Sequence, residues 1–234
     1  MQILKKIFSD TIHLIYPHIC TGCGSDLLKE DNLLCLKCIN DLPQTNFAAY
    51  PTNPIEKIFW GRIPVAAAHS QFYFEKESLI QHLIHQLKYK NNSAIGVYMG
   101  ELMGKTLLNS NRFNHIDYLI PLPLYADKER KRGYNQAKVI CDGLSAIMNV
   151  PVITGNVNRR RFTETQTRKH RTERWDNVKD SFKVANPTDL NGKHLLLVDD
   201  VVTTGATLEA CGNIILQEAA DVKLSIATLA YAAK

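Results

Sequence analysis

Beyond residue 64, apolar and polar positions alternate between two patterns. Short runs of nearly continuous apolar residues predict buried strands, and apolar residues recurring every three or four positions predict helices. The predicted order is strand, helix, helix, strand, helix, strand, strand, helix, strand, at residues 65–74, 77–89, 93–109, 116–120, 134–148, 150–154, 194–198, 206–218 and 223–230. This alternation is typical of an α/β fold with a mostly parallel sheet flanked by helices.

The first 64 residues follow different patterns. Residues 1–19 predict a short amphipathic helix, with Ile3, Ile7, Ile12 and Ile15 on one face, that ends before Pro17. A cysteine-rich stretch follows, and the proline-rich residues after it predict a linker. The expected organisation is an N-terminal helix and ribbon at 1–50, a linker at 51–63 and a main domain at 64–234.

Four cysteines form two Cys-x-x-Cys pairs in the ribbon, Cys20 with Cys23 and Cys35 with Cys38. Two intervening residues let both sulfurs of a pair face one tetrahedral ion, and two such pairs fill all four positions of a structural zinc site. Two disulfides or an iron site are the alternatives. Cys141 and Cys211 lie among apolar residues at helical spacing, which predicts core positions.

An apolar strand, two carboxylates and a small polar turn follow one another at residues 195–207. In open α/β sheets, ligands bind beyond the carboxyl ends of the strands. The amides and hydroxyls of the turn, at a helix N-terminus, suit a phosphate group, and Asp199 and Asp200 suit vicinal hydroxyls or a hydrated cation. The candidate phosphate-binding residues are Thr203, Thr204, Gly205, Ala206 and Thr207.

Three alternatives compete with a sugar-phosphate site. A nucleotide P-loop needs a lysine after its last glycine, and none follows Gly205. A receiver domain also begins with a strand and two aspartates, but only 34 residues follow Asp200, too few to complete one. An ordinary strand, turn and helix with Asp and Thr as caps is the third.

Charge is unevenly distributed along the 234 residues, whose net charge is +5. Residues 128–183 contain 14 Lys and Arg against 6 Asp and Glu, a local charge of +8, and the remainder is slightly acidic. Fixed cations near a phosphate site can hold a pyrophosphate group. They can equally track a nucleic-acid backbone, with Tyr134 and Trp175 as stacking faces, or form a solvated basic surface.

Residues 195–207 resemble the phosphoribosyl pyrophosphate signature of type I phosphoribosyltransferases. Further motifs occur in the order seen in the ComF (GntX-like) family: the four-cysteine ribbon, Leu87-Lys88-Tyr89-Lys90, Pro121-Leu122-Pro123, Arg132-Gly133-Tyr134-Asn135-Gln136, Thr163-x-x-Gln166, Arg171-x-x-Arg174 and the terminal signature. The resemblance covers nearly the whole chain. It implies a type I phosphoribosyltransferase-like fold with an N-terminal four-cysteine zinc ribbon.

The resemblance also implies roles for individual residues. Asp199 and Asp200 would hold the ribose hydroxyls, with Mg²⁺ accompanying phosphoribosyl pyrophosphate (PRPP), and the Thr-Gly-x-Thr loop would hold the 5′-phosphate. The backbone at Pro121 and Leu122, with Arg132 or Arg168, would hold pyrophosphate.

Two functions are compatible with these residues. The first is a protein that binds PRPP or a ribose 5-phosphate group and handles incoming single-stranded DNA in natural transformation, beside a helicase-like partner in the cytoplasm. The alternative is a Mg-dependent phosphoribosyltransferase acting on an unidentified amine or base. No membrane insertion is expected, because the longest apolar stretches fall well short of the ~20 residues that a span needs.

Overall fold

The computed structural model describes residues 19–26, 32–159 and 181–233. Residues 1–18 of the predicted helix at 1–19 therefore lie outside the described residues, and so does Arg168. The helices are α2 (Leu36–Asn40), α3 (Pro54–Phe59), α4 (Leu79–Tyr89), α5 (Ser93–Leu108), α6 (Ala126–Arg132), α7 (Gln136–Met148) and α9 (Ala206–Glu218). The strands are β1 (Ala67–Tyr73), β2 (Tyr118–Pro121), β3 (Val157–Arg159), β4 (Phe182–Val184), β5 (His194–Val202) and β6 (Lys223–Tyr231).

Four strands form the central sheet in the order β1-β6-β5-β2, and every pair is parallel. This confirms the predicted parallel sheet. The segment predicted as a strand at 150–154 contributes one bridge, from Val152 to Leu119, beyond β2. Pro151 lacks an amide hydrogen, which suits an edge position. Strands β3 and β4 form a separate antiparallel pair.

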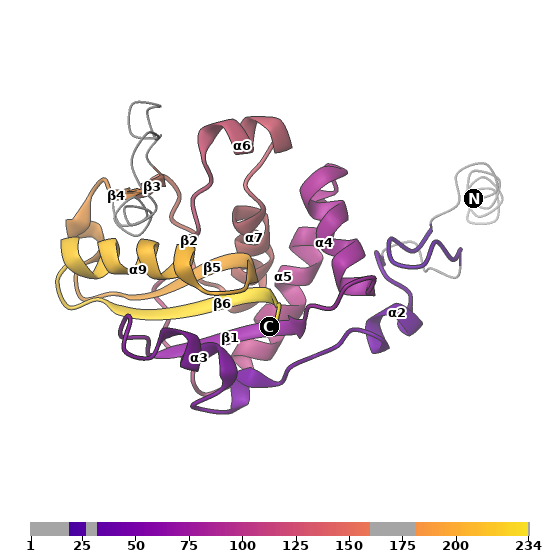
Figure 1. Cartoon of the computed structure of the whole chain (residues 1–234), viewed down its shortest axis with the longest axis horizontal. Coiled ribbons are helices and arrows are strands. Elements are labelled where there is room, and N and C mark those ends of the chain that lie inside the picture. Colours follow the sequence, from indigo (N-terminus) through magenta and orange to yellow (C-terminus); the bar gives the residue numbers. More distant parts are fainter. Residues whose placement is uncertain (1–18, 27–31, 160–180, 234) are drawn as a thin grey trace, which may run out of the picture.

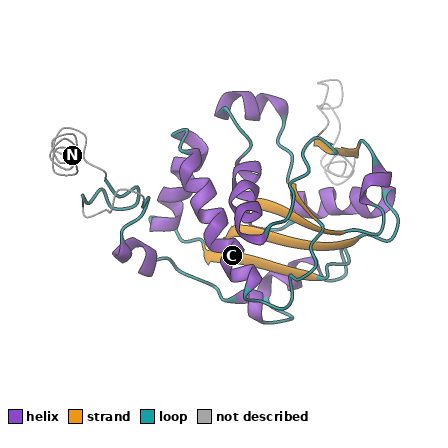
Figure 2. Cartoon of the chain, turned by 180° about the vertical axis from the view of Figure 1, so that it is seen from behind, coloured by secondary structure: helices purple, strands orange, loops and turns teal. Residues whose placement is uncertain are grey.

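Helices cover both faces of the sheet (Figures 1 and 2). Helices α4, α5 and α7 contribute to one apolar cluster, and α3 and α9 contribute to the other. Strand β5 serves both clusters, because Leu196 and Val198 belong to the first and Leu195 and Leu197 to the second. Alternate side chains of a strand point to opposite faces, so a continuous apolar run is what a doubly covered strand requires.

Helices α5 and α7 pack unusually closely through two glycines. A Cβ atom on Gly100 would collide with the carbonyl oxygen of Ile140, and one on Gly143 would collide with that of Val97. Both obstacles are backbone atoms, which cannot move aside as side chains can. The absence of side chains at these positions therefore sets the distance between the two helices.

The segment predicted as a linker contains helix α3 and belongs to the core. Asn53 caps this helix by accepting from the amides of Ile55 and Glu56, and its side-chain nitrogen donates to the carbonyl of Ala68 in β1 at 2.9 Å. Ile55 and Phe59 are fully buried. Proline at the first helical position starts this helix, so the proline content that suggested a linker marks a helix start instead.

The cysteine ribbon lies beside α4, at one end of the molecule in Figure 1. His82 of α4 contacts the carbonyl oxygen of Thr21 through Nε2 at 3.0 Å. A Cβ on Gly22 would lie 2.8 Å from a methyl group of Leu79, so the ribbon backbone approaches α4 closely. Among the described residues, no helix combines the length and apolar character needed to cross a membrane.

Candidate sugar-phosphate site

Strand β5 leads into a tight turn and then into helix α9. Gly205 is the N-cap of α9 and has φ of +71°, a left-handed conformation that glycine adopts most readily. A Cβ here would also lie 2.7 Å from Ile58 and 2.9 Å from Phe59, both on α3. The left-handed backbone conformation and the lack of room for a Cβ atom both therefore require glycine at this position.

The N-terminus of α9 is open to a ligand. Its N-cap makes no side-chain hydrogen bond, and the first amides of any α-helix lack partners within the helix. A small cavity of about 50 Å³ lies here, lined by Asp199 and by residues 201–208. Thr203 and Thr204 are exposed beside it. Amides, hydroxyls and the helix dipole together suit a phosphate group.

The two predicted carboxylates lie in the last part of β5. Asp200 is buried, and its backbone amide donates to Oδ1 of Asp199 at 2.8 Å. Desolvation, together with the neighbouring Asp200 carboxylate, raises the pKa of Asp199 to about 8. The ionised form of Asp199 is therefore disfavoured relative to that of an exposed carboxyl.

Lys88, in the last turn of α4, donates from Nζ to Oδ1 of Asp200 at 2.8 Å. The two residues are 112 positions apart in the sequence. The sequence motif that contains Lys88 contributes to the family resemblance, but it predicts no role for this lysine at the site.

The acidic pair was expected to accompany Mg²⁺ with PRPP. Mg²⁺ prefers an octahedral set of carboxylate and water oxygens. One oxygen of each carboxylate is already engaged, and a cation at Asp200 would face the ammonium group of Lys88. These residues do not fit a directly coordinated Mg²⁺ ion.

The Arg-Gly-Tyr-Asn-Gln motif connects the surrounding elements. Tyr134 donates from its hydroxyl to the carbonyl of Leu87 at 2.6 Å, and Asn135 donates to the carbonyl of Leu122 at 3.0 Å while capping α7. Arg132 donates to Gln136 at 2.6 Å. The motif therefore fixes the end of α4 and the chain after β2. Tyr134 is therefore a connecting residue through its hydroxyl, and its predicted role as a stacking face stays a prediction.

Pro121 and Leu122 lie at the same sheet edge as the acidic pair. Pro121 pairs with Val198, the residue before Asp199, and the Leu122 amide donates to the Val198 carbonyl at 2.8 Å. The structure thus brings these two predicted residues next to the β5 carboxylates. Arg132 belongs to a groove that Lys88 also lines.

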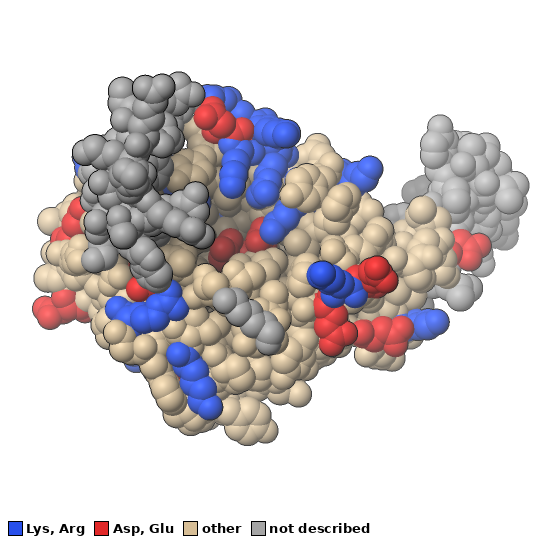
Figure 3. Space-filling view, in the orientation of Figure 1, with Lys and Arg blue, Asp and Glu red and all other residues tan. Residues whose placement is uncertain are grey.

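This cationic groove lies between the end of α4 and helix α6. It encloses about 690 Å³ and is lined by Lys88, Tyr89, Asn91, Lys128, Arg130, Lys131, Arg132 and Gly133. In Figure 3, Lys and Arg side chains gather around a hollow at the top of the molecule, with acidic side chains at its floor. Tyr89 is 65% exposed, and the Arg132 guanidinium lies 5.8 Å from its ring centroid.

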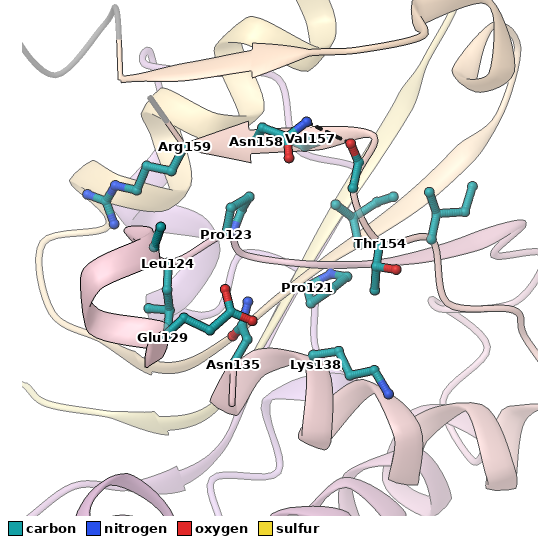
Figure 4. A pocket seen from close by; sticks show the side chains of 14 residues that line it. Pro121, Pro123, Leu124, Glu129, Asn135, Lys138, Thr154, Val157, Asn158 and Arg159 are labelled. Carbon is teal, nitrogen blue, oxygen red and sulfur yellow. Dashed lines mark hydrogen bonds between the residues drawn. The ribbon is translucent and has the colours of Figure 1, made fainter. Parts of the chain in front are cut away.

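A further cavity of about 310 Å³ lies at the end of β2 (Figure 4). Side chains from β2, α6, α7 and β3 surround it, including Pro121, Glu129, Asn135 and Arg159. The Arg159 guanidinium lies 4.0 Å from the ring centroid of Tyr125, which connects β3 with the start of α6.

Arg62 is a second residue that the sequence did not indicate. Its guanidinium donates to the carbonyl of Thr204 at 2.8 Å and forms an ion pair with Glu209 of α9. It therefore supports the turn between β5 and α9 from the segment predicted as a linker. Its position in a proline-rich stretch gave no signal of this contact.

The four ribbon cysteines come together as predicted. Their sulfur atoms all lie within 4.8 Å of one another, and all six cysteines, which fall within the described residues, are free of disulfides. This arrangement fits a zinc ribbon, with all four positions filled by sulfur. Cys141 and Cys211 are fully buried in the main domain, as expected.

Comparison with known proteins agrees with the fold. The family model for the phosphoribosyl transferase domain matches residues 131–234. The DNA utilization protein YhgH of Shigella flexneri is 30% identical over 206 residues, covering 86% of each chain. Competence protein F of Haemophilus influenzae is 27% identical over 209 residues, covering 87% of this chain and 86% of that protein. Competence protein ComFC of Bacillus subtilis is 31% identical over 111 residues, which is 47% of this chain and 43% of that protein.

The parallel sheet, the β5–α9 turn and this match define a phosphoribosyltransferase-like protein with an N-terminal cysteine ribbon. The similarity to YhgH, which covers 86% of each chain, identifies the family within this class. The chain belongs to the ComF family of competence-type proteins.

Proposed function

We propose that this protein binds PRPP or a ribose 5-phosphate group in the β5–α9 cleft and handles incoming single-stranded DNA during natural transformation, in the cytoplasm. The observation that carries the proposal is the cavity at the N-terminus of α9, lined by the turn residues and by Asp199, at the carboxyl edge of a parallel sheet. A phosphate group suits the helix end, and sugar hydroxyls suit the carboxylates.

The DNA part of the proposal is supported by the cationic groove. Its five Lys and Arg side chains can follow a phosphodiester backbone, and the exposed ring of Tyr89 offers a face for a base. Relatives that carry the names DNA utilization protein and competence protein support a competence-related role. An internal nucleotide of DNA lacks free vicinal hydroxyls. The cationic groove would therefore bind the DNA backbone, and the β5–α9 cleft would bind the ribose 5-phosphate group.

The ribbon completes the proposal. The four thiolates would hold a structural zinc ion, and the ribbon surface would dock a helicase-like partner. Because the ribbon packs against α4, such a partner would lie on the same side of the sheet as the helix that carries Lys88.

The cleft is tested by calorimetric titration of PRPP into the wild-type protein and into a variant carrying Asp199→Asn and Asp200→Asn. Loss of measurable binding in the variant, with an unchanged circular-dichroism spectrum, is expected. Asp142→Asn removes an exposed carboxylate on α7 and serves as the control, with wild-type affinity expected. Equal affinity in the double variant would contradict the proposed cleft.

The groove is tested by fluorescence anisotropy with a single-stranded oligothymidylate. A variant with Lys128, Arg130 and Lys131 replaced by Gln should bind much more weakly and with a smaller salt dependence, because fewer counterions are released. A variant with exposed Lys57, Lys105 and Lys223 replaced by Gln loses the same charge outside the groove. Equal weakening in both variants would assign binding to net charge, and the groove proposal would fail.

A further inference from the structure

Lys88 connects the proposed cleft with the cationic groove. Its ammonium group contacts Asp200 at 2.8 Å, and its side chain also lines the groove. The side chains of Lys88 and Asp200 are only 20% and 11% exposed. A charged pair this well buried is stabilised by its geometry, and removal of one partner leaves a buried charge.

The position of Lys88 is fixed by its surroundings. The preceding turns of α4 are anchored by Leu83, Ile84 and Leu87, all buried in the core. The Leu87 carbonyl accepts the Tyr134 hydroxyl, which in turn belongs to the motif that caps α7. Because α4 is held both by its apolar face and at its last turn, the ammonium group is presented to Asp200 as a fixed charge.

The charges around the acidic pair are nearly balanced without any added ion. Lys88 neutralises Asp200, and Oδ1 of Asp199 already accepts from the Asp200 amide at 2.8 Å. The guanidinium of Arg159 adds further positive charge near Asp199. A divalent cation at this place would meet a fixed ammonium group and a carboxyl oxygen that is already engaged.

We propose that Lys88 takes the place of a divalent cation at the acidic pair, so that the cleft binds an uncomplexed ribose 5-phosphate group without magnesium. This inference rests on the proposed function of the cleft. It makes Lys88 a positioning residue for Asp200, whose second oxygen then faces the sugar hydroxyls. It also distinguishes this site from one that accepts its ligand only as a magnesium complex.

The test is calorimetric titration of ribose 5-phosphate with and without Mg²⁺. The buffer alone is passed over a chelating resin, so that the ribbon cysteines keep their metal. For the wild-type protein, the dissociation constant should change by less than about threefold when Mg²⁺ is added. Binding that occurs only with Mg²⁺ would overturn the inference and leave the proposed cleft intact. Absence of binding under both conditions would overturn the cleft itself.

Variants of Lys88 test its proposed role in metal-independent binding. Lys88→Gln should weaken binding about tenfold in magnesium-free buffer, because a charge-assisted contact at the pair is lost, and added Mg²⁺ should restore part of it. Lys88→Arg keeps the charge and should retain metal-independent binding. Lys90→Gln removes an exposed charge two residues away and should match the wild type. If the Lys88→Gln variant binds ribose 5-phosphate as tightly as the wild type in magnesium-free buffer, Lys88 does not take the place of a cation.

Discussion

Asp199 is a carboxyl group whose ionised form is disfavoured by its surroundings. Desolvation and the adjacent Asp200 raise its pKa to about 8, well above the ordinary value of 3.8. The folded protein therefore keeps this proton in a pH range where the unfolded chain has released it. The resulting stabilisation is complete below the ordinary pKa and is lost as the pH rises through the raised value.

Replacement of Asp199 by Asn should remove this pH dependence. Asn keeps an acceptor for the Asp200 amide and carries no charge, so the gain in stability of Asp199→Asn over the wild type should be larger at pH 9 than at pH 5. Urea denaturation at pH 5, 7 and 9 measures the difference. A constant difference across this range would contradict the raised pKa, and Asp142→Asn should show no such trend.

Some residues of the site could be predicted from the local sequence, and others could not. The carboxylates, the glycine and the threonines of the turn lie in one contiguous run, and this run predicted their proximity. Lys88 and Arg62 approach that run from 112 and 142 residues away. Their roles depend on which elements lie side by side in the fold, and no local sequence pattern predicts that arrangement.

At the scale of elements, strongly periodic segments were predicted well. The helix expected at 206–218 is α9 with the same ends, and the strand expected at 223–230 extends by one residue in β6. Helix α6 is missing from the predicted elements, because its seven residues are mostly charged and show no apolar face. Strand β5 continues through Asp199 and Asp200 to Val202, since pairing with β6 holds the carboxylates in extended backbone.

The contact between Tyr134 and α4 is an element-scale feature with a measurable effect. Tyr134→Phe removes the hydrogen bond to the Leu87 carbonyl and should lower the free energy of unfolding by about 1 kcal/mol. It should also weaken ribose 5-phosphate binding, because Lys88 follows Leu87 directly.

Chemical denaturation and calorimetry measure the two effects of Tyr134→Phe. Tyr50→Phe provides the matched control, since Tyr50 is 63% exposed. A Tyr134→Phe variant with wild-type stability and affinity would show that α4 is held by its apolar face alone.

At the scale of the whole molecule, the ribbon and the main domain share a core. Cys20, Leu34 and Cys38 belong to the same apolar cluster as α4, α5 and α7. The sequence predicted the four-cysteine set from spacing, but the packing of that set against α4 required the fold. The cysteine cluster therefore packs against the helix that carries Lys88.

Thiol titration should separate the six cysteines into two classes. With zinc bound, reaction with a thiol reagent should be slow at all six positions. A strong zinc chelator should release about one zinc ion per chain and expose four fast thiols, and Cys141 and Cys211 should stay unreactive until the protein unfolds. A protein that contains no zinc as purified, with four fast thiols and an intact fold, would refute the zinc ribbon.

The proposed function requires the turn between β5 and α9 to hold the phosphate of a ribose 5-phosphate group. Amide chemical shifts measured by NMR during titration with ribose 5-phosphate test it most directly. The largest changes are expected at the amides of residues 203–207, with smaller changes at Asp199 and Asp200. Changes confined to α6 and the cationic groove, with residues 203–207 unaffected, would contradict the claim.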